Sequence, residues 1–200
     1  MPIQYPAGTV LSTKTSQNNI IHGKRGMIFE EQINQSNLYY LQKKIAVIHK
    51  KPTPVQVVKV DYPKRSAAKI TEAYFRHAST TDYNGVYQGF YIDFEAKETK
   101  NKTSFPLTNF HEHQVQHMEQ CLEQQGITFV LFKFSFHNRV FLLKAQHFIQ
   151  FWREKHKDGK RQSIPLSYIE KYGYEIHIGM YPIIPYLDIV KHLIDTNNKF

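Results

Sequence analysis

The chain has a single cysteine, Cys121, among its 200 residues. A single thiol excludes an internal disulfide framework and fits a protein of the reducing cytosol. Apolar residues never form the run of about 20 that is needed to span a bilayer, and the N-terminus lacks the apolar segment of a signal peptide. We therefore expect a cytoplasmic protein with no membrane partner.

Several common enzyme signatures are also missing. The sequence contains no Walker loop, no Gly-rich dinucleotide fingerprint and no Gly-x-Ser-x-Gly. Acidic residues are scarce, with 17 Asp and Glu against 26 Lys and Arg, which gives a net charge of +9. This excess suits a polyanionic partner, although a basic surface alone would equally suit a ribosomal or a membrane-surface protein.

The most informative residues that are present are Asp82 and, after twelve intervening residues, Glu95-Ala96-Lys97. From Tyr91 the chain reads Tyr-Ile-Asp-Phe-Glu-Ala-Lys, and the side chains of a strand alternate between its two faces. The apolar members of this stretch share one face. Asp93, Glu95 and Lys97 share the other, and three charged residues on one face of an aromatic strand need a reason.

Phosphodiester hydrolysis offers that reason. The reaction needs a hard cation held by oxygen ligands and relief of the negative charge on the phosphate. Asp82 and Glu95 can hold Mg²⁺, and the Lys97 ammonium on the same face can orient the attacking water and stabilise the anionic transition state. The alternatives are a solvated strand face for Glu95 and Lys97 and an ordinary turn-capping role for Asp82.

The approach to Asp82 predicts how the two carboxylates meet. Asn84-Gly85 is a strong signal for a tight turn before a strand that begins near Val86. A hairpin there would place Asp82 beside the Glu95 strand. Thr80, two residues earlier, could then direct its hydroxyl or carbonyl oxygen the same way.

A helix is predicted between Asn109 and Gly126. Asn109 has the character of an N-cap, Glu112 sits at N3, and Gly126 is a plausible C′ residue. Gln114 falls within the apolar arc of this helix, and a buried amide must find partners. Its oxygen could bond a neighbouring backbone group, or it could project toward a metal site at the sheet edge.

Three histidines, His111, His113 and His117, lie close together at the start of this helix, and His113 and His117 are one turn apart. That spacing could bind zinc. No cysteine or carboxylate constellation completes such a site in the sequence, so we interpret them as helix-surface histidines near the path of the phosphates.

The rest of the chain predicts one domain over residues 24–200, preceded by a flexible polar arm at residues 1–23. We expect helices from Gly26 and over residues 145–155 and 186–194, and strands over 45–48, 55–60, 127–134, 139–143 and 174–178. A projection is expected at about residues 56–79, where aromatic rings alternate with basic side chains. Such a surface can contact phosphates and stack on unpaired bases, and a solvated helix-loop face is the alternative. The residues concerned are Lys64, Arg65, Lys69, Tyr74, Phe75 and Arg76.

Several strings together resemble the RecU family of Holliday-junction resolvases. They are Arg25-Gly26-Met27 with Glu30, residues 50–55, residues 60–66, Ser79-Thr80-Thr81-Asp82-Tyr83-Asn84-Gly85, residues 93–100 and Phe105-Pro106-Leu107. The resemblance runs from about residue 24 to the C-terminus and is dense between residues 47 and 117. The arm and the region after residue 126 match only loosely.

The resemblance implies an α/β restriction-endonuclease-like fold, with a mixed β-sheet flanked by helices and a projecting stalk. It implies an endonuclease that depends on Mg²⁺, for which Mn²⁺ can substitute, and that resolves four-way DNA junctions by paired symmetric nicks in recombination and repair. By motif position, the metal ligands would be Thr80, Asp82, Glu95 and Gln114. Lys97 would stabilise the transition state, Glu30 would lend support, and Arg25 would join the residues that bind DNA.

The partners that follow are four-way junction DNA and a second copy of the chain, since two symmetric nicks call for a two-fold pair of active sites. A recombinase and branch-migration proteins are further candidate partners, and such a protein would associate with the nucleoid. Two other functions stay open: a nuclease of the same chemistry that cuts flaps or plain duplex, and a scaffold that binds branched DNA and regulates a recombinase.

Overall fold

The computed structural model describes residues 16–63, 67–76, 80–158 and 162–196, and for residues 16–27 and 155–158 it describes the backbone alone. Residues 1–15 of the predicted arm therefore lie outside the described part of the chain. So do Lys64, Arg65 and the side chain of Arg25, which were expected to bind DNA.

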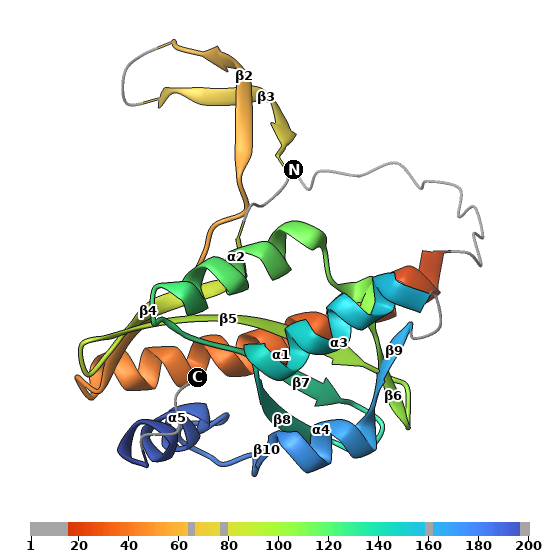
Figure 1. Ribbon diagram of the computed structural model, residues 1–200. Helices are drawn as coiled ribbons and strands as arrows, with labels where there is room; N and C mark the ends of the chain where they lie inside the picture. Colours follow the sequence, from red (N-terminus) through yellow and green to blue (C-terminus); the bar gives the residue numbers. More distant parts are fainter. Residues whose placement is uncertain (1–15, 64–66, 77–79, 159–161, 197–200) are drawn as a thin grey trace, which may run out of the picture.

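A mixed six-stranded sheet forms the centre of the molecule, in the order β1-β4-β5-β7-β8-β10 (Figure 1). Strands β5 and β7 pair in parallel, and every other neighbouring pair in this sheet is antiparallel. The strands are β1 (Ala46–Lys50), β4 (Tyr83–Tyr87), β5 (Phe90–Thr99), β7 (Ile127–Phe134), β8 (Arg139–Lys144) and β10 (Tyr174–Ile176).

Helices cover both faces of this sheet. Helices α1 (Ser16–Gln42) and α5 (Tyr186–Asp195) pack on one face, and α2 (Glu112–Glu123), α3 (Ala145–Asp158) and α4 (Leu166–Tyr172) pack on the other. Strand β7 is buried along its whole length, because alternate residues enter the two cores. Phe129 belongs to the α1/α5 core and Phe132 to the α2/α3 core. This architecture confirms the predicted α/β fold class.

Aromatic stacking fixes the part of the sheet that carries the candidate site. The ring of Phe94 on β5 lies between those of Tyr83 on β4 and Phe129 on β7, with centroids 4.8 Å apart in both pairs. All three rings are buried on the α1/α5 side. Since strand side chains alternate, the neighbours of Phe94 on β5, Asp93 and Glu95, must face α2 and α3.

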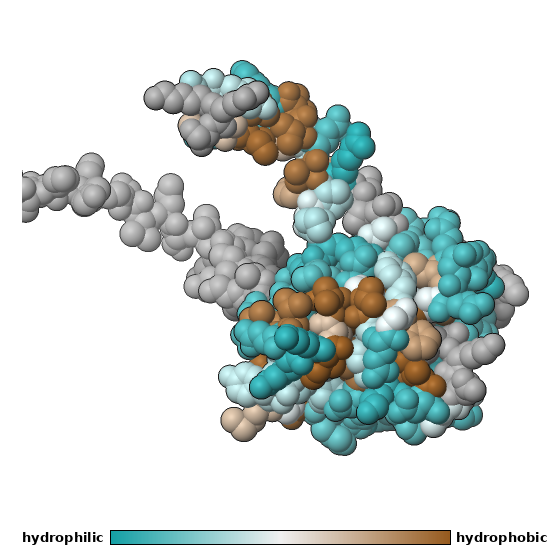
Figure 2. All heavy atoms as spheres, turned by 90° about the vertical axis from the view of Figure 1, so that its left-hand side faces the viewer, coloured by the Kyte–Doolittle hydropathy of each residue, from teal (hydrophilic) through white to brown (hydrophobic). Residues whose placement is uncertain are grey.

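A separate two-stranded sheet, β2 (Val55–Asp61) paired with β3 (Lys69–Phe75), stands away from the main body (Figure 1). The segment in which we expected a projection contains this hairpin. Its apolar side chains are exposed, as the brown spheres on the projecting part of Figure 2 show. Phe75 is 83% exposed, so the hairpin has no hydrophobic core of its own to bury it.

Short elements complete the described fold. They are β6 (Ser104–Pro106), which pairs with β9 (Ser163–Pro165), and the 3₁₀-helix η2 (Leu107–Asn109). No described helix is long and apolar enough to cross a membrane.

Three local predictions are wrong. Helix α1 begins at Ser16 rather than near Gly26, so residues 16–23 of the predicted arm are helical, and no proline interrupts them. Asn84-Gly85 lies inside β4, where Gly85 pairs with Ile48. A Cβ at Gly85 would meet the Val47 carbonyl oxygen at 2.0 Å, so this glycine serves close strand approach and not a turn.

The third error concerns the ends of α2. Its N-cap is His111 and not Asn109, and its N3 residue is Gln114 and not Glu112. At the other end, Gln125 adopts the left-handed conformation, with φ of 63°. The Gly126 N–H then reaches back to the Cys121 carbonyl at 2.8 Å. The C′ residue of α2 is therefore Gln125, and not Gly126 as predicted from the sequence.

Candidate active site

The β4–β5 hairpin brings Asp82 and Glu95 together. Its turn lies at Gln88 and Gly89, both with positive φ, and its register pairs Tyr83 with Phe94. Asp82 and Glu95 are the next residues along each strand, so they face each other. The Asp82 backbone N–H donates a hydrogen bond of 3.1 Å to Glu95 Oε2.

Lys97 joins the two carboxylates because it lies two residues after Glu95 on the same face of β5. Its Nζ lies 2.5 Å from Glu95 Oε1 and 3.8 Å from Asp82 Oδ2. We call these three residues the Glu95 cluster. The side chain of Glu95 is fully buried, while those of Lys97 and Asp82 are 24% and 39% exposed. The cluster therefore runs from the interior to the surface.

Glu95 Oε1 is an unusual buried atom. Lys97 forms an ion pair of 2.5 Å with Oε1, and no described residue donates a hydrogen bond of regular geometry to this atom. Burial raises the pKa of Glu95 to about 8, with Asp82 adding to the rise and Lys97 opposing it. Burial also pulls the pKa of Lys97 down, but Glu95 and Asp82 outweigh it and leave that pKa above its usual value. The one cation beside Glu95, Lys97, therefore does not offset the burial of this carboxylate.

A pocket of about 470 Å³ opens beside the cluster. The described residues that line it include Glu30, Asp82, Lys97, Lys100, Asn109 and Ser135. The two carboxylates supply oxygen ligands, which Mg²⁺ prefers. The unsatisfied Oε1 of Glu95 and the partly exposed Asp82 carboxylate therefore fit a divalent cation.

Comparison with known proteins gives the family. A family model described as RecU, recombination protein U, matches residues 24–192. The chain belongs to the RecU family. It is 58% identical to the Holliday junction resolvase RecU of Lactiplantibacillus plantarum, over 100% of this chain and 99% of that protein. It is 57% identical to the RecU resolvases of Pediococcus pentosaceus, over 98% and 100%, and of one Streptococcus pneumoniae strain, over 94% and 96%.

Three further residues were predicted for the site: Thr80 and Gln114 as metal ligands and Glu30 as a supporting acid. Glu30 on α1 lines the same pocket and forms an ion pair of 2.5 Å with Lys50. Thr80 is half-buried, and its hydroxyl lies 3.3 Å from the Thr81 carbonyl oxygen. The buried Gln114 accepts the His111 N–H on Oε1 at 3.0 Å and so closes the N-terminal capping box of α2. Neither Thr80 nor Gln114 is among the described residues that line the pocket.

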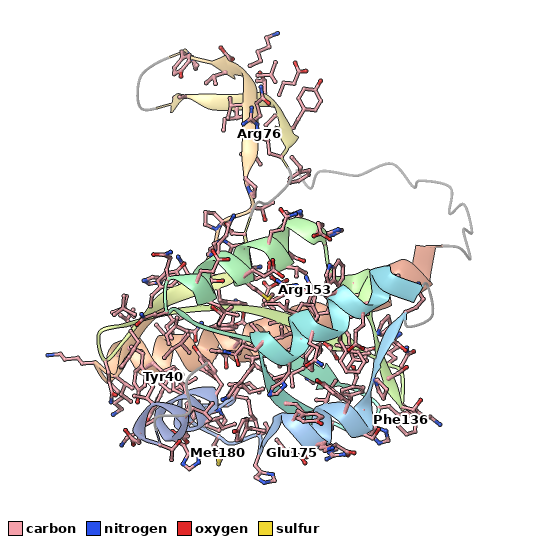
Figure 3. All side chains as sticks on the ribbon, in the orientation of Figure 1. Tyr40, Arg76, Phe136, Arg153, Glu175 and Met180 are labelled. Carbon is pink, nitrogen blue, oxygen red and sulfur yellow. The ribbon has the colours of Figure 1, made fainter. Side chains whose placement is uncertain are left out.

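The described DNA-binding candidates all belong to the hairpin or its end. Lys69, Tyr74, Phe75 and Arg76 are exposed, and Figure 3 shows Arg76 on the projecting part, away from the body. The Tyr74 hydroxyl donates to Glu72 at 2.8 Å, and Arg76 Nε donates to Gln56 at 3.1 Å. These contacts hold the two side chains against the hairpin while their surfaces remain open.

Sequence reasoning missed a second group on the same strand. Asp93 is fully buried, and its Oδ2 accepts hydrogen bonds of 2.8 Å from both Lys51 Nζ and the Tyr91 hydroxyl. The Thr81 hydroxyl donates to its Oδ1, and His117 Nε2 lies 3.1 Å from Oδ2. With Cys121, whose Sγ is 3.5 Å from His117 Nε2, these residues are called the Asp93 cluster.

Charge is balanced in this group. Burial alone would raise the pKa of Asp93, but hydrogen bonds from His117, Lys51 and Thr81 outweigh it and leave that pKa lowered. The hydrogen bond to Asp93 raises the pKa of His117 to about 9, with a further contribution from Cys121. Asp93 is therefore an anion with its positive charges already in place.

The prediction that no cysteine or carboxylate completes a site around the histidines is wrong for His117, which contacts both Asp93 and Cys121. His111 and His113 stack on each other, with ring centroids 5.4 Å apart. The spacing of His117 and Cys121, four residues apart on one helix, was the available sequence signal.

Proposed function

We propose that this chain is a Mg²⁺-dependent endonuclease that resolves four-way DNA junctions by paired symmetric nicks. The observation that carries the proposal is the convergence of Asp82, Glu95 and Lys97 beside a pocket. Membership of the RecU family supports it, because relatives that match nearly the whole chain are named Holliday junction resolvases. The net charge of +9 suits a DNA substrate.

Asp82 and Glu95 would hold the metal. Mg²⁺, or Mn²⁺ in its place, would supply a water of lowered pKa and neutralise charge on the scissile phosphate. Glu95 brings a buried oxygen with no hydrogen bond among the described residues, and the Asp82 backbone N–H keeps the other oxygen of that carboxylate in position. This anchoring leaves Glu95 little freedom to turn away.

Lys97 would contribute its charge to the transition state. Its Nζ already lies between the two carboxylates and is partly exposed to the pocket. When phosphate approaches, the ammonium can donate to the non-bridging oxygens, where negative charge develops. A lysine suits this task because its flexible stem lets the charge follow the phosphate.

Thr80, Gln114 and Glu30 complete the proposed set. Gln114 already accepts one hydrogen bond, from His111, and its amide oxygen has a second lone pair for a ligand. Glu30 lines the pocket from α1, paired with Lys50. We assign Glu30 a supporting role through the charge that it adds to the pocket.

The β2–β3 hairpin is the proposed junction-binding element. Exposed Tyr74 and Phe75 can stack on bases that are already unpaired at the centre of a junction, and Lys69 and Arg76 can contact phosphates. A junction has two-fold symmetry, so two symmetric nicks require two copies of a site that each chain carries once. A homodimer is therefore part of the proposal, and a recombinase or branch-migration protein could bind the assembled complex.

The test is cleavage of a labelled synthetic four-way junction with Mg²⁺ by the wild-type chain, Asp82→Asn and Lys97→Ala. We expect paired symmetric nicks from the wild type alone, with Asp82→Asn still binding the junction. Tight binding without cleavage by any of the three proteins would contradict the enzyme and leave the branched-DNA scaffold.

A hairpin deletion separates junction resolution from other nuclease functions. Removing residues 62–76 should abolish junction cleavage while the six-stranded sheet, which shares no strand with the hairpin, stays folded by circular dichroism. Unchanged junction cleavage would contradict the proposed role of the hairpin, and equal cleavage of flaps or plain duplex by the intact chain would favour a nuclease of broader substrate range.

A further inference from the structure

Three metal-binding atoms of different chemical types meet between β5 and α2. Asp93 Oδ2, His117 Nε2 and Cys121 Sγ all lie within 4.8 Å of one another. The nitrogen lies 3.1 Å from the oxygen and 3.5 Å from the sulfur. Asp93 comes from the strand, and His117 and Cys121 come from successive turns of the helix, so one ion here would join the two elements.

Hydrogen bonding satisfies this arrangement only in part. A single ring nitrogen, Nε2 of His117, faces both the carboxylate and the thiol. If Nε2 carries a proton it can donate to Asp93, but it can no longer accept the Cys121 S–H. If it lacks the proton, it can accept from the thiol but leaves the carboxylate without that donor.

A four-coordinate ion matches the same spacing. Tetrahedral Zn²⁺ with bonds of about 2.0 Å to nitrogen and oxygen and about 2.3 Å to sulfur places nitrogen and sulfur about 3.5 Å apart, and nitrogen and oxygen about 3.3 Å apart. The observed separations of 3.5 and 3.1 Å match these two pairs. The carboxylate oxygen and the sulfur lie within 4.8 Å of each other, and a bound ion would hold them about 3.5 Å apart. Three protein ligands would leave the fourth position to water.

We propose that Asp93, His117 and Cys121 bind a borderline-soft divalent cation of the Zn²⁺ type, at a site separate from the Mg²⁺ site of Asp82 and Glu95. The thiolate selects against Mg²⁺, which prefers oxygen ligands alone. Binding displaces the protons of His117 Nε2 and of the Cys121 thiol, because both residues coordinate in their deprotonated forms. The ion clamps α2 onto the strand that carries Glu95.

The neighbours of Asp93 act as supports for this ligand. Tyr91 and Thr81 donate hydroxyl hydrogen bonds to the carboxylate, and Lys51 donates to both Asp93 and Thr81. Such outer contacts orient a metal-binding carboxylate. The Lys51 charge also repels a divalent cation, so the affinity should be lower than that of a zinc site with no cation beside it.

Co²⁺ absorption spectroscopy of the full chain tests the site directly. Cys121 is the only cysteine, so a thiolate-to-Co²⁺ charge-transfer band can arise from this site alone. We expect the band to saturate at one Co²⁺ per chain, to disappear on addition of Zn²⁺ and to persist in the Asp82→Asn/Glu95→Gln double variant. Cleavage activity is not the readout, so the result is independent of the proposed function.

Variants of the ligands decide the outcome. Cys121→Ser should abolish the band, and His117→Gln should weaken Co²⁺ binding by more than about 100-fold, since even the loss of a supporting contact costs 10–100-fold. His113→Gln, on the same helix, is the matched control and should change nothing. Zn²⁺ should also raise the Tm of the wild type but not that of Cys121→Ser. The absence of a band, one ion per two chains, or an unchanged band in His117→Gln would each overturn the site.

Discussion

Asp93 and Glu95 are two buried carboxylates on one face of one strand, and their surroundings are opposite. Asp93 is surrounded by Lys51, His117 and hydroxyl donors, and its pKa is lowered. Glu95 is also buried but has a single cation, Lys97, and a second acid, Asp82, beside it, and its pKa is raised to about 8. Burial is the same in both, so the difference comes from the partners.

The contrast separates a structural anion from a ligand that lacks its cation. The charge of Asp93 is compensated within the protein, so this acid needs no metal ion to stay ionised, whereas Glu95 has an oxygen that a divalent cation would satisfy. Glu95 does not itself line the pocket, but it contacts Asp82 and Lys97, which do, and a strongly perturbed acid beside a pocket is a candidate functional group. On this comparison, Glu95 serves chemistry and Asp93 serves the fold, with the Zn²⁺-type site as an added use of Asp93.

The largest expected effect is on cleavage. Glu95→Gln should reduce junction cleavage by about 10³-fold or more, because loss of a metal ligand forfeits several kcal/mol of transition-state stabilisation. Glu175→Gln is the matched control, since Glu175 lies on β10, three strands from β5, at the end of the molecule opposite the hairpin (Figure 3). Rates in single-turnover assays would measure both. Comparable rates for Glu95→Gln and Glu175→Gln would contradict the assignment of Glu95 as a metal ligand.

Next in size is a loss of stability at Asp93. Asp93→Asn should lower the free energy of unfolding by about 3–5 kcal/mol, because it leaves the Lys51 and His117 charges without their buried partner. Glu95→Gln should keep or increase that free energy at neutral pH, since it replaces an uncompensated buried acid. Urea denaturation of the two variants is the measurement. A larger loss for Glu95→Gln than for Asp93→Asn would reverse the assigned roles.

The pH dependence of stability should show Glu95. In the unfolded chain this acid loses its proton near 4.5, whereas in the folded chain without metal it does so at about 8. The folded state binds more protons between these values, so the free energy of unfolding should fall by a few kcal/mol, as an order of magnitude, from about pH 5 to pH 8. Asp93, with a lowered pKa, contributes stability that is lost only at acid pH.

Glu95→Gln should remove this fall in the free energy of unfolding with pH. Any pH dependence that remains in the variant comes from the other titrating groups. Chemical denaturation in a chelator at several pH values would give both curves. Mg²⁺ should also flatten the wild-type curve, because a bound cation favours the ionised carboxylate. Parallel curves for wild type and Glu95→Gln would mean that Glu95 titrates alike in the folded and unfolded chains.

The smallest expected effect concerns the two lysines. Lys51→Met should cost about 1–3 kcal/mol of stability, because it removes a charged hydrogen bond from the Asp93 anion. Lys97→Met should cost less, since Glu95, with a pKa of about 8, is already largely protonated at pH 7 and loses little when its cation is removed. Thermal unfolding of the pair at pH 7 would compare them. An equal or larger loss for Lys97→Met would show that Glu95 is held as an anion in the metal-free chain.

The sequence predicted the β5 face well because alternation along a strand is a local property. Asp93, Glu95 and Lys97 share one face, as the period of two indicates. The meeting of Asp82 and Glu95 was expected from a hairpin, but for the wrong turn: Gln88-Gly89 makes it, and Gly85 lies inside β4 against β1. A glycine that permits close strand approach and one that permits a turn look the same in a sequence.

The Asp93 cluster could not be read from the sequence. Its contacts join Lys51, Asp93 and His117, which are separated by 42 and 24 residues. The pairing of β1, β4 and β5 brings Lys51 to Asp93, and the packing of α2 on the sheet brings His117 there. The sequence also could not decide the role of Gln114. A glutamine at this position can cap the helix or bind a metal ion, and both roles use its amide oxygen. The start of α1 was missed since its first turns are polar and carry no apolar period.

The most direct test of the central claim is an NMR titration of the Glu95 and Asp93 side-chain carboxyl carbons, with and without Mg²⁺. We expect Glu95 to titrate near 8 in the metal-free chain and well below that with Mg²⁺, while Asp93 stays ionised down to acid pH in both. A Glu95 carboxyl that titrates near its ordinary value in the metal-free chain, or that Mg²⁺ leaves unmoved, would contradict the assignment of Glu95 as the poised metal ligand.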